Sequence, residues 1–343
     1  MTLKKFLKKI FAPLLTRLAS NASVPDKKQV HKSLSRLLHN LKSIKGKRGI
    51  TLNINFSTDK FIIFSDHHKG NKDHGDDFAG NEPNYLAALD YYLANNFTYI
   101  NLGDSEELWK YTPGQVISKN ITALRAEAKF QMQKKYYKAF GNHDITWKNK
   151  LDVDKWFKDI FTLPLPVLEG ILLKTNTDTK PLSIFLTHGH QGDKMSDNNS
   201  LSTWLVAHVW RPIQRYLEIN VNTPAKDYRL RDKHNIMMYE WSSCKENLLL
   251  ITGHTHKPVF ASGKYSDHES NKIDESFSGD KKIYLKPSYF NSGCCCYNDG
   301  DITGIEIADG KISLIKWHTQ NNISARVILE ETSLQQVATD LKN

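Results

Sequence analysis

The chain has 343 residues, 39% of them hydrophobic, which is enough for a large core. No stretch approaches the ~20 apolar residues that a membrane-spanning helix needs. Lys8, Lys9 and Arg17 interrupt the apolar start of the chain, which argues against a secretory signal. Three of the four cysteines are adjacent, a spacing that suits neither a disulfide framework nor a zinc knuckle, so we expect a reducing, cytoplasmic location.

The net charge of +10 is concentrated at the N-terminus. Residues 1–50 hold 13 of the 47 basic side chains and one of the 37 acidic ones, so this arm carries +12 and the remainder −2. Within residues 1–20, apolar side chains recur at helical spacing opposite a lysine-rich face, a pattern typical of a helix lying on an anionic membrane. Packing on its own domain or on a second subunit is the alternative. Nucleic acid is an unlikely partner, because the arm lacks interleaved aromatic residues and a reading motif.

Further along the chain, strands and helices alternate. A second helical pattern runs from Val30 to Leu41 and ends at a glycine-rich stretch. We then expect strands at residues 61–64, 99–102, 137–140, 168–174, 182–186 and 248–252, helices at 84–94 and 121–135, and hairpins within 283–317. This order predicts an α/β fold whose late part is mostly β.

Two segments interrupt this order. Residues 196–246 look helical and are expected to form a cap inserted between two strands, whereas residues 261–282 are polar and rich in Gly and Ser, as in a solvated loop. The predicted organisation is therefore a basic arm over residues 1–50, a domain over 51–330 and a C-terminal helix or tail over 331–343.

Five short polar motifs follow five of the expected strands. In chain order they are Ser65-Asp-His-His68, Gly103-Asp-Ser-Glu-Glu107, Gly141-Asn-His-Asp144, Thr187-His-Gly-His190 and Gly253-His-Thr-His256. The carboxyl ends of strands in an α/β sheet are where sites assemble. Mixed Asp, His and Asn ligation suits Mn²⁺, Fe²⁺ or Zn²⁺ better than Ca²⁺ or Mg²⁺. Two such cations ~3.5–4 Å apart can activate water and stabilise an anionic transition state.

The ordered series of D-x-H, G-D-x-x-[DE], G-N-H-[DE], H and G-H-x-H resembles the signature of the calcineurin-like metallophosphoesterases. It spans residues 66–256, with every element present. The resemblance implies a four-layer α/β/β/α sandwich, here with a helical cap insertion and a basic helical N-terminal arm. It also implies hydrolysis of a phosphoester or pyrophosphate by a hydroxide that bridges two divalent metals, most readily Mn²⁺.

The resemblance also implies individual roles. Asp66, His68 and His256 would bind one metal, and Asn142, His188 and His254 the other. Asp104 would bridge both metals. His143 would stabilise charge or donate a proton to the leaving oxygen, and Asp144 would orient His143 through a hydrogen bond.

Other residues near the motifs have weaker claims. His190, Glu107 and Asn291 are candidates for contacts with the ligands or the substrate, whereas His67 lies one position off the D-x-H pattern and is expected to pack or face solvent. Trp109 is expected in the core rather than as a substrate platform. Cys294 to Cys296 are interpreted as inert thiols.

The family acts on many phosphoesters, so the motifs alone do not select a substrate. The stretches 188–197 and 253–258 and the expected cap are similar to the UDP-2,3-diacylglucosamine hydrolase branch, which implies a lipid pyrophosphate at the membrane surface. The basic arm would place the active site near anionic lipid at the inner face of the membrane, although the long arm and the 262–281 loop are not typical of that branch. That branch usually carries Arg where this chain has His143. A phosphomonoesterase or phosphodiesterase acting on nucleotides or phosphoproteins therefore stays open, as does a non-catalytic scaffold, although the complete ligand set speaks against a scaffold.

Overall fold

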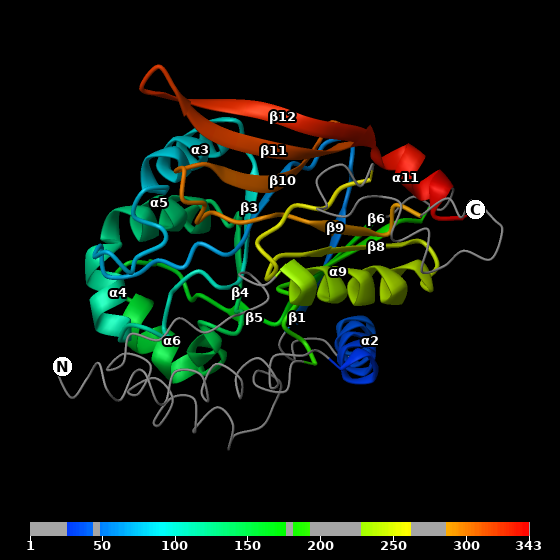
Figure 1. The fold of residues 1–343 in the computed structure, drawn as a ribbon, viewed down its shortest axis with the longest axis horizontal. Helices are drawn as coiled ribbons and strands as arrows, with labels where there is room; N and C mark the ends of the chain where they lie inside the picture. Colours follow the sequence, from blue (N-terminus) through cyan, green and yellow to red (C-terminus); the bar gives the residue numbers. More distant parts are fainter. Residues whose placement is uncertain (1–25, 44–48, 176–180, 193–227, 262–285, 343) are drawn as a thin grey trace.

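The structure is a computed structural model, and it describes residues 26–43, 49–175, 181–192, 228–261 and 286–342. Over these ranges, two β-sheets stack face to face and helices cover both outer faces (Figure 1). This arrangement confirms the predicted four-layer α/β/β/α sandwich. Among the described helices, none is long and apolar enough to cross a membrane.

The larger sheet has seven strands in the described ranges, in the order β12-β11-β10-β2-β3-β4-β5. Their bounds are β2 Phe61–Phe64, β3 Thr98–Leu102, β4 Tyr136–Ala139, β5 Val167–Leu168, β10 Ile302–Ala308, β11 Lys311–Gln320 and β12 Ile323–Ser333. The strands β2 to β5 run parallel, and β10 joins antiparallel to β2. The run Phe61–Phe64 is buried throughout, as expected for a central parallel strand.

The second sheet has five strands in the same ranges, in the order β1-β6-β7-β8-β9. Their bounds are β1 Gly49–Ile54, β6 Gly170–Thr175, β7 Ser183–Thr187, β8 Leu248–Thr252 and β9 Tyr289–Asn291. The strands β7, β8 and β9 are parallel, so their carboxyl ends lie at one edge. Aliphatic side chains such as Ile63, Leu102 and Ile251 fill the space between the two sheets.

Helices cover the outer face of the larger sheet. They are α3 Glu82–Ala94, α4 Pro113–Lys119, α5 Ile121–Met132 and α6 Lys150–Phe157, with a short 3₁₀ turn, η1, at Ile145–Lys148. The core under them is aromatic, with Tyr85, Tyr99 and Phe130 fully buried. Figure 1 shows these helices on the side opposite α2 (Lys27–Ser43) and α9 (Tyr228–Ser243), which cover the five-stranded sheet.

The helix α2 corrects the predicted boundary of the arm. Residues 27–43 belong to the arm by charge, but Val30, Leu34 and Leu37 are buried against the five-stranded sheet and α9. The basic residues of this helix occupy its exposed side, so their charge gave no sign of the packed face. Residues 27–43 are therefore packed on the domain, and residues 1–25 of the expected arm lie outside the described residues.

The expected cap and C-terminal segment also differ in detail. The described end of the 196–246 segment is α9, whose Met238 and Trp241 pack on the sheet as part of the outer layer. Residues 196–227, like most of the 261–282 loop, lie outside the described residues. At the C-terminus, β12 continues to Ser333 and α11 covers Leu334–Asp340.

Candidate metal centre

The loops after β2, β3, β4, β7 and β8 carry the five motifs. Backbone hydrogen bonds join these loops beyond the ends of the strands: the N–H of Asp66 donates to the carbonyl of Gly103 at 3.0 Å, and the N–H of Gly253 to that of His188 at 3.0 Å. The first bond extends the β2–β3 pairing, and the second extends β7–β8. The polar residues of the five motif loops therefore lie together at one edge of the two sheets.

Five residues of these motifs have left-handed backbone conformations, which side chains with a Cβ rarely adopt. They are Asp66 at φ 53°, His68 at 51°, Asp104 at 49°, His254 at 69° and His256 at 57°. Such conformations cost of order 1–3 kcal/mol each and cluster at functional sites. The strain therefore marks five of the seven residues that the motif analysis selected as metal ligands.

Two motif glycines permit close approach of the loops. A Cβ on Gly141 would collide with the carboxylate of Asp104, and a Cβ on Gly253 would collide with the side chains of Ser65 and Asp66. Any other residue at these positions would push the loops apart. The glycines of the motifs thus set the spacing between their acidic and imidazole groups.

The carboxylates of Asp66 and Asp104 each have one oxygen bound to backbone. Oδ2 of Asp66 accepts from the N–H of His254 at 2.9 Å, and Oδ1 of Asp104 accepts from the N–H of His143 at 2.7 Å. The other oxygen of each carboxylate faces the imidazoles. Both carboxylates are therefore oriented by loops that carry other site residues.

Three histidines approach these oxygens, and His254 lies beside them. Nε2 of His188 lies 3.2 Å from Oδ2 of Asp104, and Nε2 of His256 lies 3.3 Å from Oδ1 of Asp66. Nε2 of His68 is 3.0 Å from Nε2 of His256 and 3.8 Å from Oδ2 of Asp104. The ring of His254 lies 5.2 Å from that of His188.

The described residues contain three groups whose ligand atoms lie within 4.8 Å of one another. These are His68, His256 and Cys296; His68, Asp104 and His143; and Asp104, His188 and His254. Asp104 belongs to two of the groups, one on each side. A carboxylate in this position could be shared by two cations.

The electrostatics of the centre favour positive charge. Burial alone would lower the pKa of His188, but Asp104 and Asp66 raise the pKa to about 9. The pKa of His256 is likewise raised to about 9, because Asp66 outweighs the effect of burial. The pKa of Asp104 lies well below its usual range, since His188 and His143 outweigh the burial that would raise it.

The centre also has the donor set that divalent metals need. Within the described residues, neither Oδ1 of Asp66 nor Oδ1 of Asn142 accepts a hydrogen bond, although both atoms are buried. Buried acceptors of this kind are normally satisfied, and a cation would satisfy them. Carboxylate, amide and imidazole donors are also those that Mn²⁺, Fe²⁺ and Zn²⁺ accept. The residues present therefore fit a pair of divalent metals.

His143 is held by Glu107. Nδ1 of His143 lies 3.0 Å from both carboxylate oxygens of Glu107, and Nδ1 of His68 lies 3.2 Å from Oε2 of the same residue. The ring of His143 is 4.5 Å from that of His68, and its side chain is 14% exposed. His143 therefore lies beside the cluster with one nitrogen fixed.

The prediction that Asp144 orients His143 through a hydrogen bond is wrong. Its carboxylate accepts from the N–H groups of Gly141 at 2.6 Å and Ser105 at 2.8 Å, and so ties two motif loops together. The chain at residues 143–144 directs the two side chains to different neighbours. Glu107, from a distant part of the sequence, is the group that orients His143.

Other expected residues lie behind the cluster. The amide of Asn291 donates to the carbonyl of Gly253 at 2.6 Å and to Oγ1 of Thr255 at 3.1 Å, which supports the Gly253–His256 loop. His190 is buried with its ring 5.4 Å from that of His188, and burial lowers its pKa to about 3. His67 packs on Tyr85, with ring centroids 4.9 Å apart, outside the cluster.

Three further side chains lie at the site: His234, which the sequence analysis did not single out; Trp109, which was expected in the core but is only partly buried; and Cys296, which was interpreted as an inert thiol. His234 of α9 stands 5.1 Å from His254 between ring centroids, and Trp109 stacks on His143 at 3.9 Å. Sγ of Cys296 is 3.6 Å from Nδ1 of His256. No motif marks these positions. Only their polar or aromatic type, together with their place after a strand or in a helix beside the motif loops, could have suggested them.

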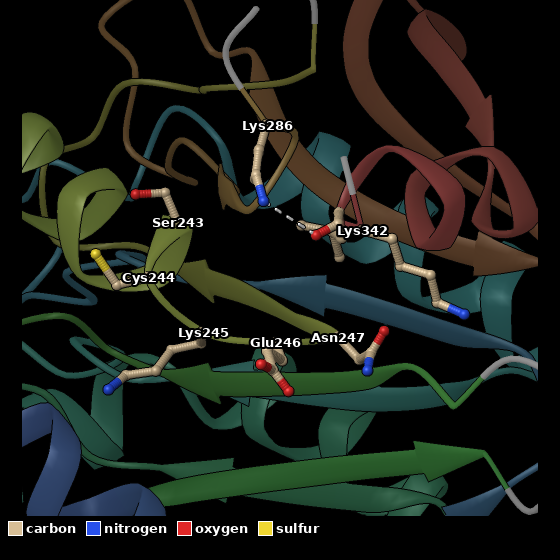
Figure 2. Close-up of a pocket in the computed structure, with 8 residues that line it drawn as sticks. Ser243, Cys244, Lys245, Glu246, Asn247, Lys286 and Lys342 are labelled. Atoms are coloured by element: carbon tan, nitrogen blue, oxygen red, sulfur yellow. Dashed lines mark hydrogen bonds between the residues drawn. The ribbon is translucent and has the colours of Figure 1, made fainter.

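A separate hollow of about 470 Å³ lies at the amino end of β8, and Figure 2 shows the side chains that line it. Cys244, Lys245 and Glu246 line one side, and Lys286, whose Nζ donates to the carbonyl of Leu341 at 3.4 Å, lies on another. Since the metal centre is built at the carboxyl ends of the strands, this hollow belongs to the opposite edge.

The chain was compared with solved structures and with curated proteins. Among solved structures, Vacuolar Protein Sorting 29 from Cryptosporidium parvum is 13% identical, with a TM-score of 0.34, and the match covers 80% of this chain and 98% of that one. A single mutant of Vps29 from Entamoeba histolytica is 12% identical, with a TM-score of 0.31, and the match covers 79% of this chain and 99% of that one. No curated protein matches the sequence.

The family comparison is decisive. Residues 59–258, more than half of the chain, match the model of the calcineurin-like phosphoesterase family, and this range includes all five motif loops. Members of this family generally bind two divalent metals, and the chain has candidate ligand groups for them. The protein therefore belongs to the calcineurin-like phosphoesterases.

Proposed function

We propose that this protein hydrolyses phosphoester or phosphoanhydride bonds with two divalent metals, Mn²⁺ in the first instance and Fe²⁺ or Zn²⁺ as alternatives. The observation that carries the proposal is the position of Asp104. Its ligand atoms belong both to the group with His68 and His143 and to the group with His188 and His254. A carboxylate placed in this way can serve two ions at once.

The residues around Asp104 would have different roles in the reaction. Asp66, His68 and His256 would hold one ion, and Asn142, His188 and His254 the other. When bound, the ions would polarise the phosphoryl group and activate water. His143 is partly exposed and bound through Nδ1 to Glu107, which leaves its other nitrogen to donate a proton to the leaving oxygen.

A non-catalytic scaffold is the alternative from another class. A scaffold needs no ligand set, yet seven ligand residues and His143 are all retained, and five of them are in costly backbone conformations. Strain of this kind is maintained where it serves a function. The proposal of an active enzyme is therefore preferred.

The test is metal content together with turnover of a chromogenic phosphodiester by protein loaded with Mn²⁺. We expect two metals per chain and measurable turnover, with both lost in Asp104→Ala. Asp90→Ala, which removes an exposed carboxylate of α3 that pairs with Lys129, is the matched control and should change neither quantity. Two metals retained in Asp104→Ala would contradict the bridging role.

We propose a UDP-diacylglucosamine-like lipid pyrophosphate as the leading substrate. The similarity of residues 188–197 and 253–258 to the corresponding hydrolase branch supports this substrate, as does the basic pattern of residues 1–20. His143, where that branch usually has Arg, favours instead a phosphomonoester or phosphodiester such as a nucleotide or phosphoprotein. A far higher kcat/KM for UDP-diacylglucosamine than for the chromogenic diester would select the lipid.

Peripheral attachment to the inner face of the membrane is part of the same proposal. Deleting residues 1–20 should weaken binding to vesicles containing anionic lipid and leave turnover of the small ester unchanged. Equal vesicle binding by the shortened chain would leave the arm to pack on protein, either its own domain or a second subunit.

A further inference from the structure

Cys296 lies against the half of the centre formed by Asp66, His68 and His256. Its Sγ is 3.6 Å from Nδ1 of His256, and its ligand atom is within 4.8 Å of those of His68 and His256. The cysteine segment is tied to the same loop as Asp66, because the N–H of Cys295 donates to the carbonyl of Asp66 at 3.1 Å. The sulfur is therefore held at this position by backbone contacts.

Two other histidines of the centre, His188 and His68, share one arrangement. Nε2 of His188 faces Asp104 while its Nδ1 is 3.1 Å from the carbonyl of Leu102. Nε2 of His68 faces the cluster while its Nδ1 is 3.2 Å from Glu107. A neutral imidazole that binds a metal through one nitrogen carries its proton on the other and needs an acceptor there.

His256 repeats this arrangement with sulfur as its partner. Its Nε2 faces Oδ1 of Asp66 at 3.3 Å and Nε2 of His68 at 3.0 Å, while its Nδ1 meets Sγ of Cys296. We propose that Cys296 is the positioning residue of His256, with its sulfur accepting the Nδ1–H and so presenting Nε2 to a metal. The inference rests on the proposed metal centre.

The choice of sulfur has consequences. A thiol sulfur is a weaker acceptor than a carbonyl or carboxylate oxygen, so His256 is the least firmly held of these three histidines. Cys296 is also partly exposed, whereas Cys294 and Cys295 are buried. Replacement of this sulfur should therefore affect one half of the metal centre and spare the other.

The experiment is a calorimetric Mn²⁺ titration of the full chain and of three variants. Cys296→Ala should weaken one of the two metal sites by roughly 10–100-fold, the usual effect of losing such a partner, and leave the other unchanged. Cys296→Ser keeps an acceptor and should recover affinity at least in part. Cys244→Ser, at an exposed cysteine in the hollow of Figure 2, should match the wild type.

The outcomes separate the two proposals. Normal affinity at both sites in Cys296→Ala overturns the role of Cys296 alone, and equal weakening of both sites does the same by showing a general structural effect. A wild-type chain that binds no metal overturns the proposed function as well. Finally, a thiolate-to-Co²⁺ charge-transfer band in the Co²⁺-loaded wild type that disappears in Cys296→Ala would show direct ligation and replace the positioning role.

Discussion

Trp109 lies flat against His143, with ring centroids 3.9 Å apart and the planes inclined by 19°. Its indole Nε1–H donates to the carbonyl of Asn142 at 2.9 Å. One side chain thus contacts both a candidate metal ligand and the proposed proton donor. Glu107 holds the imidazole of His143 at Nδ1, and Trp109 packs against the face of the ring.

Removal of this contact should slow the reaction without removing the metals. We expect Trp109→Ala to lower kcat by roughly 10–100-fold, because small displacements of a reacting group have effects of this size. Metal content should stay at two per chain. Trp109→Phe retains an aromatic face and should lie between wild type and Trp109→Ala. Wild-type kcat in Trp109→Ala would show that the stacked ring only fills space.

The contact between His143 and Glu107 gives a second prediction. His143→Ala should lower kcat by roughly 10²–10⁴-fold and leave the metals bound, as expected for a lost proton donor. Glu107→Gln should cost less turnover in the His143→Ala background than in the wild type, because the two residues act through one contact. The measurement is a double-mutant cycle on kcat. Fully additive losses would indicate that Glu107 acts through His68 instead.

The sequence could predict which side chains converge at the centre, because their positions depend on local features. Each motif follows an apolar strand and contains the glycine or left-handed residue that its turn needs, as Gly253 and His254 illustrate. Contacts between distant elements could not be predicted in this way. Glu107 reaches His143, and Cys296 reaches His256, only because the sheets bring their loops to one edge.

The same limit explains the errors in the predicted fold. The sequence of the helix α2 predicts part of a basic arm, because its exposed face carries the positive charge. Its apolar face does not specify which surface it packs against. Asp144 was assigned to His143 by adjacency in the sequence. Its carboxylate turns instead to the backbone of Gly141 and Ser105, where it joins two loops.

A buried ion pair beneath the centre leads to a stability prediction. Nζ of Lys69 lies 2.7 Å from Oε1 of Glu127 and donates to Oγ of Ser105 at 2.6 Å, and all three side chains are inaccessible to solvent. Removing one partner of a buried pair leaves an uncompensated charge. Lys69→Met should therefore lower the free energy of unfolding by about 3–5 kcal/mol.

Urea unfolding would measure this change. Lys129→Met is the matched control, because it removes an exposed pair with Asp90 and should change the free energy of unfolding by less than about 1 kcal/mol. Equal small effects of the two substitutions would show that Glu127 is satisfied by its tyrosine neighbours, Tyr85 and Tyr136, without the lysine.

Metal binding should depend on pH. Burial would lower the pKa of His188 and His256, but the adjacent carboxylates raise both pKa values to about 9. Without metal, both side chains are therefore protonated on both ring nitrogens and positively charged at neutral pH. A metal must displace these protons, since only the neutral imidazole is a ligand. The apparent affinity should therefore rise as the pH increases toward about 9 and level off above it. Mn²⁺ titrations in buffers of different ionisation enthalpy would detect the released protons. Binding that releases none, with an affinity independent of pH, would show that these two imidazoles are not ligands.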